Sequence, residues 1–141
     1  MNKTPFDSHE QNKHNWYIID ASNQTLGRLS TKVASTLKGK HKSNYSPHAS
    51  ARDFIIIINA GKVKVSGNKY WNKLYRFHSC RPGGMKTEKF FELQKRLPNR
   101  IIERSVKGML PKNSLGRKMF SRLKIYSDSS HPHVAQNPIQ L

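Results

Sequence analysis

Five consecutive apolar residues, Phe-Ile-Ile-Ile-Ile at positions 54–58, constrain the fold of this chain more than any other feature. An apolar, mostly β-branched run of this length that ends in turn-forming residues predicts a buried strand. Strands covered on both faces are typical of parallel sheets, because the crossovers between parallel strands place helices against the sheet. The run is far shorter than the roughly 20 apolar residues that a membrane-spanning helix needs, so no membrane span is expected.

The segments around this run alternate between strand and helix patterns. Residues 16–20 form a mainly aromatic and β-branched run that predicts a strand. After Thr25, apolar residues at helical spacing predict a helix that ends at Gly39. Further strands are expected over residues 73–78 and 123–126, and a short element over 63–65. Further helices are expected over residues 87–95, 99–109 and 114–121. Strands that alternate with helices predict an α/β layer fold.

A single domain is expected, because 141 residues can bury one core but not two. Residues 1–15 are polar without periodicity and are interpreted as an N-terminal tail. Residues 16–128 contain the expected helices and strands and form the domain. The end of the chain is rich in Ser, Pro, His and Asn, so residues 129–141 are expected to follow the surface as a tail without regular structure.

The charge of the chain is strongly one-sided, since 26 Lys and Arg residues stand against 8 Asp and Glu residues and give a formal net charge of +18. Self-repulsion of this size favours binding to a polyanion. Nucleic acid is the strongest candidate, because cations that neutralise phosphates release condensed counterions. An anionic membrane surface is the alternative. No helix-turn-helix, zinc-finger or leucine-zipper pattern is present, so RNA is favoured over DNA.

The cations are concentrated rather than interspersed with acids. Residues 106–126 contain six Lys or Arg and no acid, and residues 81–124 contain thirteen Lys or Arg against three Glu. Glycines and prolines between these cations favour a backbone that lies close to phosphate, with Arg for bidentate and Lys for point contacts. The predicted RNA-binding residues are Lys38, Lys40, His41, Lys42, Tyr45, Lys69, Arg76, His78, Arg81, Gly83, Gly84, Lys107, Lys112, Arg117, Lys118 and Arg122.

Aromatic side chains lie near these cations in the sequence. Unpaired bases of folded RNA commonly stack on aromatic rings. The candidates for such stacking are Tyr45, Tyr70, Trp71, Tyr75 and Phe77. Packing in the core is an equally good interpretation of Tyr75 and Phe77.

The sequence offers little support for catalysis, a cofactor or a metal. The closely spaced glycines of phosphate-binding loops are absent, and Cys80, the single cysteine, lies near His78 without a nucleophile motif around it. The histidines lack the cysteines or carboxylates that would complete a metal site. The chain is therefore not expected to be an enzyme. Two alternatives remain: an RNA-processing enzyme, which would need Glu103 or Asp53 with a histidine as its acid–base pair, and a free regulatory RNA binder.

Several motifs, in order along the chain, resemble the large-subunit ribosomal protein L13 family in its bacterial or plastid type. The most specific is Val-Lys-Gly-Met-Leu-Pro at 106–111, followed by Gly-Arg at 116–117 and Leu-Lys-Ile-Tyr at 123–126 with Asp128. Further matching segments are 16–21 with 25–29, 39–42 with Tyr45 and 47–48, 59–60 with 62–63 and 67–69, and the ending 131–138. The resemblance covers about residues 14–138.

This resemblance implies a structural constituent of the large ribosomal subunit that binds large-subunit rRNA and joins early in subunit assembly. Its other partners would be neighbouring large-subunit proteins. A membrane, DNA and a second copy of the chain are not expected as partners. The implied fold is a three-layer α/β/α sandwich around a small, mostly parallel four-stranded sheet, with extended basic loops and tails. The implied location is the large subunit of ribosomes in the bacterial cytoplasm or the plastid stroma.

One departure from the family pattern lies in residues 78–84. Bacterial members commonly have Gly and then an aromatic residue where this chain has Cys80 and Arg81. If that aromatic residue stacks on RNA in relatives, Arg81 is expected to replace the stacking with a contact to phosphate or to the plane of a base.

Overall fold

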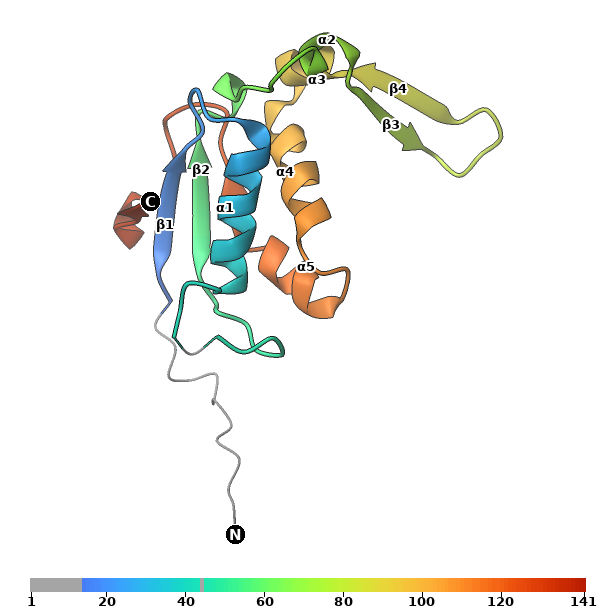
Figure 1. Ribbon diagram of the computed structural model, residues 1–141. Coiled ribbons are helices and arrows are strands. Elements are labelled where there is room, and N and C mark those ends of the chain that lie inside the picture. The colour runs from blue at the N-terminus through green and yellow to red at the C-terminus, as the bar shows by residue number, and fades with distance from the viewer. Residues whose placement is uncertain (1–13, 44) are drawn as a thin grey trace.

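A mixed α/β fold, in which helices flank a four-stranded parallel sheet, is seen in the computed structural model, which describes residues 14–43 and 45–141 (Figure 1). The sheet consists of β1 (Trp16–Asp20), β2 (Phe54–Ile58), β5 (Leu123–Ile125) and β6 (Ile139–Gln140) in the order β5-β2-β1-β6. A separate antiparallel hairpin pairs β3 (Leu74–His78) with β4 (Met85–Lys89). The α-helices are α1 (Leu26–Lys38), α2 (Lys69–Asn72), α3 (Phe90–Arg96), α4 (Pro98–Met109) and α5 (Ser114–Phe120). Two short 3-10 helices span Ala60–Lys62 and Val134–Gln136.

The main core lies between one face of the sheet and the helices α1 and α4, which pack against each other (Figure 1). Ile19, Ile55 and Ile57 point to this side, because side chains alternate between the two faces of a strand. The facing side chains of the two helices recur every three or four residues and include Leu29, Val33, Leu37, Ile102 and Val106. Burial of each such aliphatic side chain contributes about 1.5–3 kcal/mol to stability, so the helical spacing of the sequence determines which surfaces meet.

The opposite face of the sheet contacts the C-terminal segment, which contains the 3-10 helix Val134–Gln136 and forms a thin third layer. Trp16 and Phe54 stack on this face with ring centroids 4.3 Å apart, and His133 lies 5.2 Å from Trp16. The Tyr126 hydroxyl and His133 Nε2 are hydrogen-bonded at 2.8 Å, which connects the end of β5 to this segment. Between these layers Ile56 is fully buried, as the apolar run at 54–58 predicts.

The strands over 16–20 and 54–58 and the helix that ends before Gly39 are confirmed. Gly39 has a φ of 75°, and a Cβ at this position would lie 2.3 Å from the Cβ of Ala51. Glycine is therefore needed here both for the left-handed conformation and for the close approach of the following loop.

The strand predicted over 73–78 is confirmed as β3, which pairs with β4 outside the main sheet. Two other expectations about secondary structure were wrong in part. The helix predicted over 87–95 begins at Phe90, because residues 85–89 complete the hairpin. The C-terminal segment is not free of regular structure: Ile139–Gln140 pairs with β1 as the fourth strand of the sheet. None of the described helices is long and apolar enough to cross a membrane.

Candidate nucleic-acid interface

Two of the three groups of predicted RNA-binding residues meet at the amino-terminal edge of the parallel sheet. Helix α1 ends at this edge and continues into the loop 39–53 that enters β2, while α5 lies beside the loop and leads into β5 (Figure 1). The Arg122 guanidinium donates a hydrogen bond to Ser50 Oγ and joins the two segments directly. We call this surface the basic edge; its predicted residues are Lys38, Lys40, His41, Lys42, Tyr45, Lys107, Lys112, Arg117, Lys118 and Arg122.

The opposite, carboxyl-terminal edge of the sheet has mixed charge. Asp20 accepts hydrogen bonds there from Ser22 N at 2.9 Å and from Asn59 Nδ2 at 3.0 Å, and it also accepts from Ser22 Oγ. These bonds from Ser22 and Asn59, with the nearby charge of Lys62, hold the pKa of the Asp20 carboxyl below its usual range. An acidic group of this kind repels phosphate, so the basic edge is the more suitable of the two for a polyanion.

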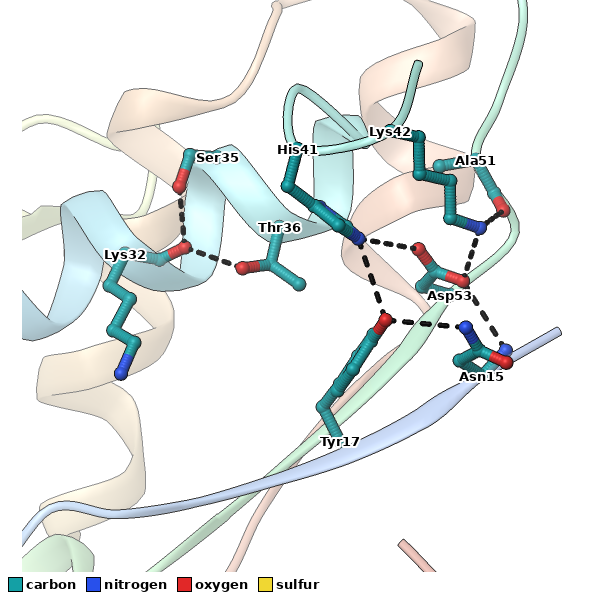
Figure 2. A network of polar contacts seen from close by, with 9 residues as sticks. All are labelled: Asn15, Tyr17, Lys32, Ser35, Thr36, His41, Lys42, Ala51 and Asp53. Atoms are coloured by element: carbon teal, nitrogen blue, oxygen red, sulfur yellow. Dashed lines mark hydrogen bonds and ion pairs between the residues drawn. The ribbon is translucent and has the colours of Figure 1, made fainter. Parts of the chain in front are cut away.

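A buried carboxylate fixes the loop 39–53 to the end of the sheet (Figure 2). Asp53 is fully buried, and its Oδ1 atom accepts from Lys42 Nζ at 2.7 Å and from Asn15 N at 3.3 Å. Lys42 Nζ also donates to the Ala51 carbonyl at 3.2 Å. His41 Nε2 lies 3.8 Å from Asp53 Oδ2 and 3.5 Å from the Tyr17 hydroxyl. The network therefore determines the path of the loop on which the outward-facing cations lie.

The predicted cations of the basic edge differ in accessibility. Lys42 is used inside the protein by Asp53 and Ala51, and its side chain is only 19% exposed. Arg122 is half-buried, and this burial, with the neighbouring charge of Arg52, lowers the pKa of its guanidinium. These two residues hold the loop and the sheet together. The exposed cations of the edge are Lys40, Lys107, Lys112, Arg117 and Lys118, with Lys38 half-buried beside them.

The connection between α4 and α5 is held by backbone packing. Asn113 Oδ1 accepts from Gly116 N at 2.8 Å, which is the usual role of Asn at a helix N-cap. A Cβ at position 116 would lie 1.8 Å from the Pro111 carbonyl oxygen, so only glycine allows this close packing. Leu110 is buried and anchors the start of the connection. Most of the apolar residues of segment 106–126 thus face the protein, whereas Met109 and most of the cations are exposed.

The third predicted group lies apart from the basic edge, on α2 and on the hairpin that projects from the body (Figure 1). It comprises Lys69, Arg76, His78, Arg81, Gly83 and Gly84, and all of these except the half-buried Gly84 are exposed. The guanidinium of Arg104 on α4 lies 5.4 Å from the ring centroid of Tyr75 and 4.9 Å from that of Phe77, and it donates to the Arg76 carbonyl at 3.0 Å. Arg104 thereby holds the base of the hairpin against the body.

Of the aromatic candidates for base stacking, Tyr75 is buried at 5% exposure and belongs to the core, whereas Trp71 is 59% exposed. At the tip of the hairpin, Cys80 has a left-handed φ of 62° and its backbone N–H donates to His78 Nδ1 at 3.0 Å. The family pattern has glycine at position 80. Glycine adopts this left-handed conformation without strain, whereas cysteine does not. Arg81 is exposed beside it.

The structure brings together one of the acid–base pairs considered from the sequence, Asp53 with His41. The carboxylate is fully buried and already accepts from Lys42, so a substrate has no access to it. Within residues 14–43 and 45–141, no group of three or more His, Cys, Asp or Glu side chains is placed to hold a metal ion.

Two residues that organise the interface were not predicted from the sequence. Asn113 could have been found from the preference of Asn for N-caps. Ser50 had no local pattern, because its partner Arg122 is 72 residues away in the chain.

The fold and this surface together define a class: small, basic α/β proteins in which loops at one edge of a parallel sheet expose an excess of cations. A family model described as Ribosomal protein L13 matches residues 14–132. The chain is 57% identical over 141 residues to "Large ribosomal subunit protein uL13" of Prochlorococcus marinus (strain MIT 9312), and the aligned region covers 100% of this chain and 99% of that protein. It is 56% identical over 138 residues to the protein of the same name from Synechococcus sp. (strain WH7803), with 98% and 92% covered.

The chain therefore belongs to the ribosomal protein L13 family. The resemblance recognised from the sequence motifs is confirmed, and the relatives named above are from cyanobacteria, in agreement with the bacterial or plastid type.

Proposed function

We propose that this protein is a structural constituent of the large ribosomal subunit that binds large-subunit rRNA through the basic edge and joins early in subunit assembly. Its role is architectural rather than catalytic, and it works in the ribosomes of a bacterial cytoplasm or a plastid stroma. Neighbouring large-subunit proteins are its other partners. The hairpin residues Arg76, His78 and Arg81 make a second RNA contact, with the backbone at Gly83 and Gly84 close to phosphate.

The observation that carries this proposal is the gathering of two distant cationic segments on one edge of the sheet. Residues 38–43 and 107–122 are far apart in the sequence, yet Arg122 donates a hydrogen bond to Ser50 in the loop that follows residues 38–43 and so connects that loop to the second segment. Among the described residues, Lys42 and Arg96 are the Lys and Arg side chains that pair with a carboxylate within 4 Å. The exposed cations of the basic edge are therefore available to neutralise the phosphates of a polyanion such as folded RNA.

The experiment is to measure the affinity for a large-subunit rRNA transcript as a function of salt concentration. Each phosphate contact contributes about 0.9 to the slope of log K against log salt on a B-DNA duplex and about 0.7 on a single strand. Lys40→Ala, Lys112→Ala and Lys118→Ala should each reduce the slope by roughly that amount.

The matched control is Lys62→Ala, which removes an exposed cation at the opposite edge beside Asp20 and should leave the slope unchanged. Equal slopes for wild type and all three edge variants would remove the basic edge from the RNA contact. Sedimentation of the tagged protein with free fractions rather than with large subunits in a sucrose gradient would favour the free regulatory binder instead. Cleaved or modified RNA after incubation with the pure protein would favour the enzyme.

A further inference from the structure

We propose that a groove between α4 and α5 is a binding site for one unpaired rRNA nucleotide, whose base enters the groove while the adjoining phosphates contact the cations at its mouth. This inference rests on the proposed function, because it assumes that RNA lies on the basic edge. It adds a specific ligand and a specific contact to that surface.

The groove has a volume of about 460 Å³ and lies where the chain turns from α4 into α5. This volume falls within the range of about 300–1,000 Å³ that is usual for small-ligand pockets. Its apolar lining comes from Leu110, Pro111 and Phe120, and Leu110 is only 5% exposed. The shape is fixed by the cap of Asn113 on Gly116 and by the close packing of Gly116 against Pro111. The site is thus preformed.

All charged residues that line the groove are cations: Lys107, Lys112 and Arg117. Lys107 Nζ lies 5.9 Å from the centroid of the Phe120 ring, so a cation and an aromatic side chain are neighbours in the groove. A nucleotide combines a flat, largely apolar base with an anionic phosphate, and this lining matches both parts. An apolar protein segment would leave the cations without partners, and a paired base would have no surface free to enter the groove.

Base recognition by contact with aromatic and apolar side chains is insensitive to salt, unlike the neutralisation of phosphates. The two contributions can therefore be separated by substitution. Phe120→Leu keeps an apolar side chain in the core contact of α5 but removes the ring. Lys112→Ala removes one cation at the mouth.

The test measures rRNA affinity of the full chain over a range of salt concentrations for both variants. Phe120→Leu should weaken binding by about 5-fold or more without a change in slope, since base–aromatic contacts contribute strongly to single-strand binding. Lys112→Ala should lower the slope by about 0.7 to 0.9. Phe54→Leu is the matched control, because Phe54 is half-buried against Trp16 on the face of the sheet opposite α1 and α4, away from the groove, and should leave affinity unchanged.

A second measurement requires no substitution. The wild-type complex is irradiated with short-wavelength ultraviolet light, and the RNA-linked peptides are identified by mass spectrometry. Links to peptides that contain Leu110, Pro111 or Phe120 support the site.

The nucleotide site would be overturned if a folded Phe120→Leu variant bound rRNA with the wild-type affinity and the RNA were linked only to peptides outside the groove. That result would leave the proposed function intact. A segment of a neighbouring protein seen in the groove in a map of the large subunit would also overturn it. Failure of the wild-type protein to bind rRNA would overturn both.

Discussion

Lys42→Ala should destabilise the protein rather than simply weaken its contact with RNA. The substitution removes the ammonium that lies 2.7 Å from Asp53 Oδ1 and leaves a fully buried carboxylate without its main partner. Truncating one member of a buried ion pair usually costs about 3–5 kcal/mol. Lys42 retains 19% exposure, and Asn15 N still donates to the same oxygen, so the lower end of that range, about 3 kcal/mol, applies here. For a chain of this size the loss corresponds to a fall in Tm of roughly 10 °C.

The assay is urea and thermal unfolding of the free protein, followed by far-UV circular dichroism. Lys40→Ala is the matched control, because Lys40 lies in the same loop with an exposed side chain and should change stability by less than about 0.5 kcal/mol. Combining Lys42→Ala with Asp53→Asn should recover part of the loss, since the buried charge disappears while an acceptor for Asn15 remains.

If Lys42→Ala and Lys40→Ala unfold at the same urea concentration, Lys42 does not compensate the buried carboxylate and the network in Figure 2 does not hold the loop. The same pair of variants should behave in the opposite way toward RNA: Lys40→Ala should reduce the salt slope, and Lys42→Ala should change it little at temperatures where the variant is folded.

Three further substitutions test the local geometry. Gly116→Ala should destabilise the protein by about 1–3 kcal/mol, because the added Cβ would clash with the Pro111 carbonyl. Gly108→Ala is the control and should stabilise the protein by about 0.5 kcal/mol, because the space around its Cβ is open. Equal Tm values for the two variants would contradict the close packing at Gly116. Cys80→Gly should raise stability by about 0.5–1 kcal/mol in urea unfolding by relieving the left-handed strain, and a loss would show that the cysteine side chain matters more. The lowered pKa of Asp20 stabilises the folded protein fully above the ordinary aspartate pKa of about 3.9, and this stabilisation is lost as the pH falls through the lower folded-state pKa. The Tm of Asp20→Asn should therefore fall less on acidification than that of the wild type. Identical pH profiles of Tm for the two proteins would rule out this contribution of Asp20.

The family and the α/β class could be obtained from the sequence because both depend on local patterns. The apolar run at 54–58 and the helical spacing over 26–37 specify buried faces, and burial of those faces dominates the free energy of folding. Within the motif at 106–117, Val106 and Leu110 are buried in the core.

The hairpin and the fourth strand could not be obtained in the same way. Met85–Lys89 is polar and exposed on most positions, so its strand conformation comes from pairing with β3 rather than from its own pattern. Ile139–Gln140 is two residues long and becomes a strand only because β1 offers an unpaired edge.

The sequence by itself determined that the chain forms an α/β domain with a large excess of cations and resembles one ribosomal protein family. Only the tertiary structure decided how those cations are used. Lys42 and Arg122 look equivalent to Lys40 and Lys118 in the sequence, but the fold places the first two against Asp53 and Ser50 and leaves the other two exposed. The physical reason is that the cost of burying a charge depends on partners that are distant in the chain, and the fold alone brings those partners together.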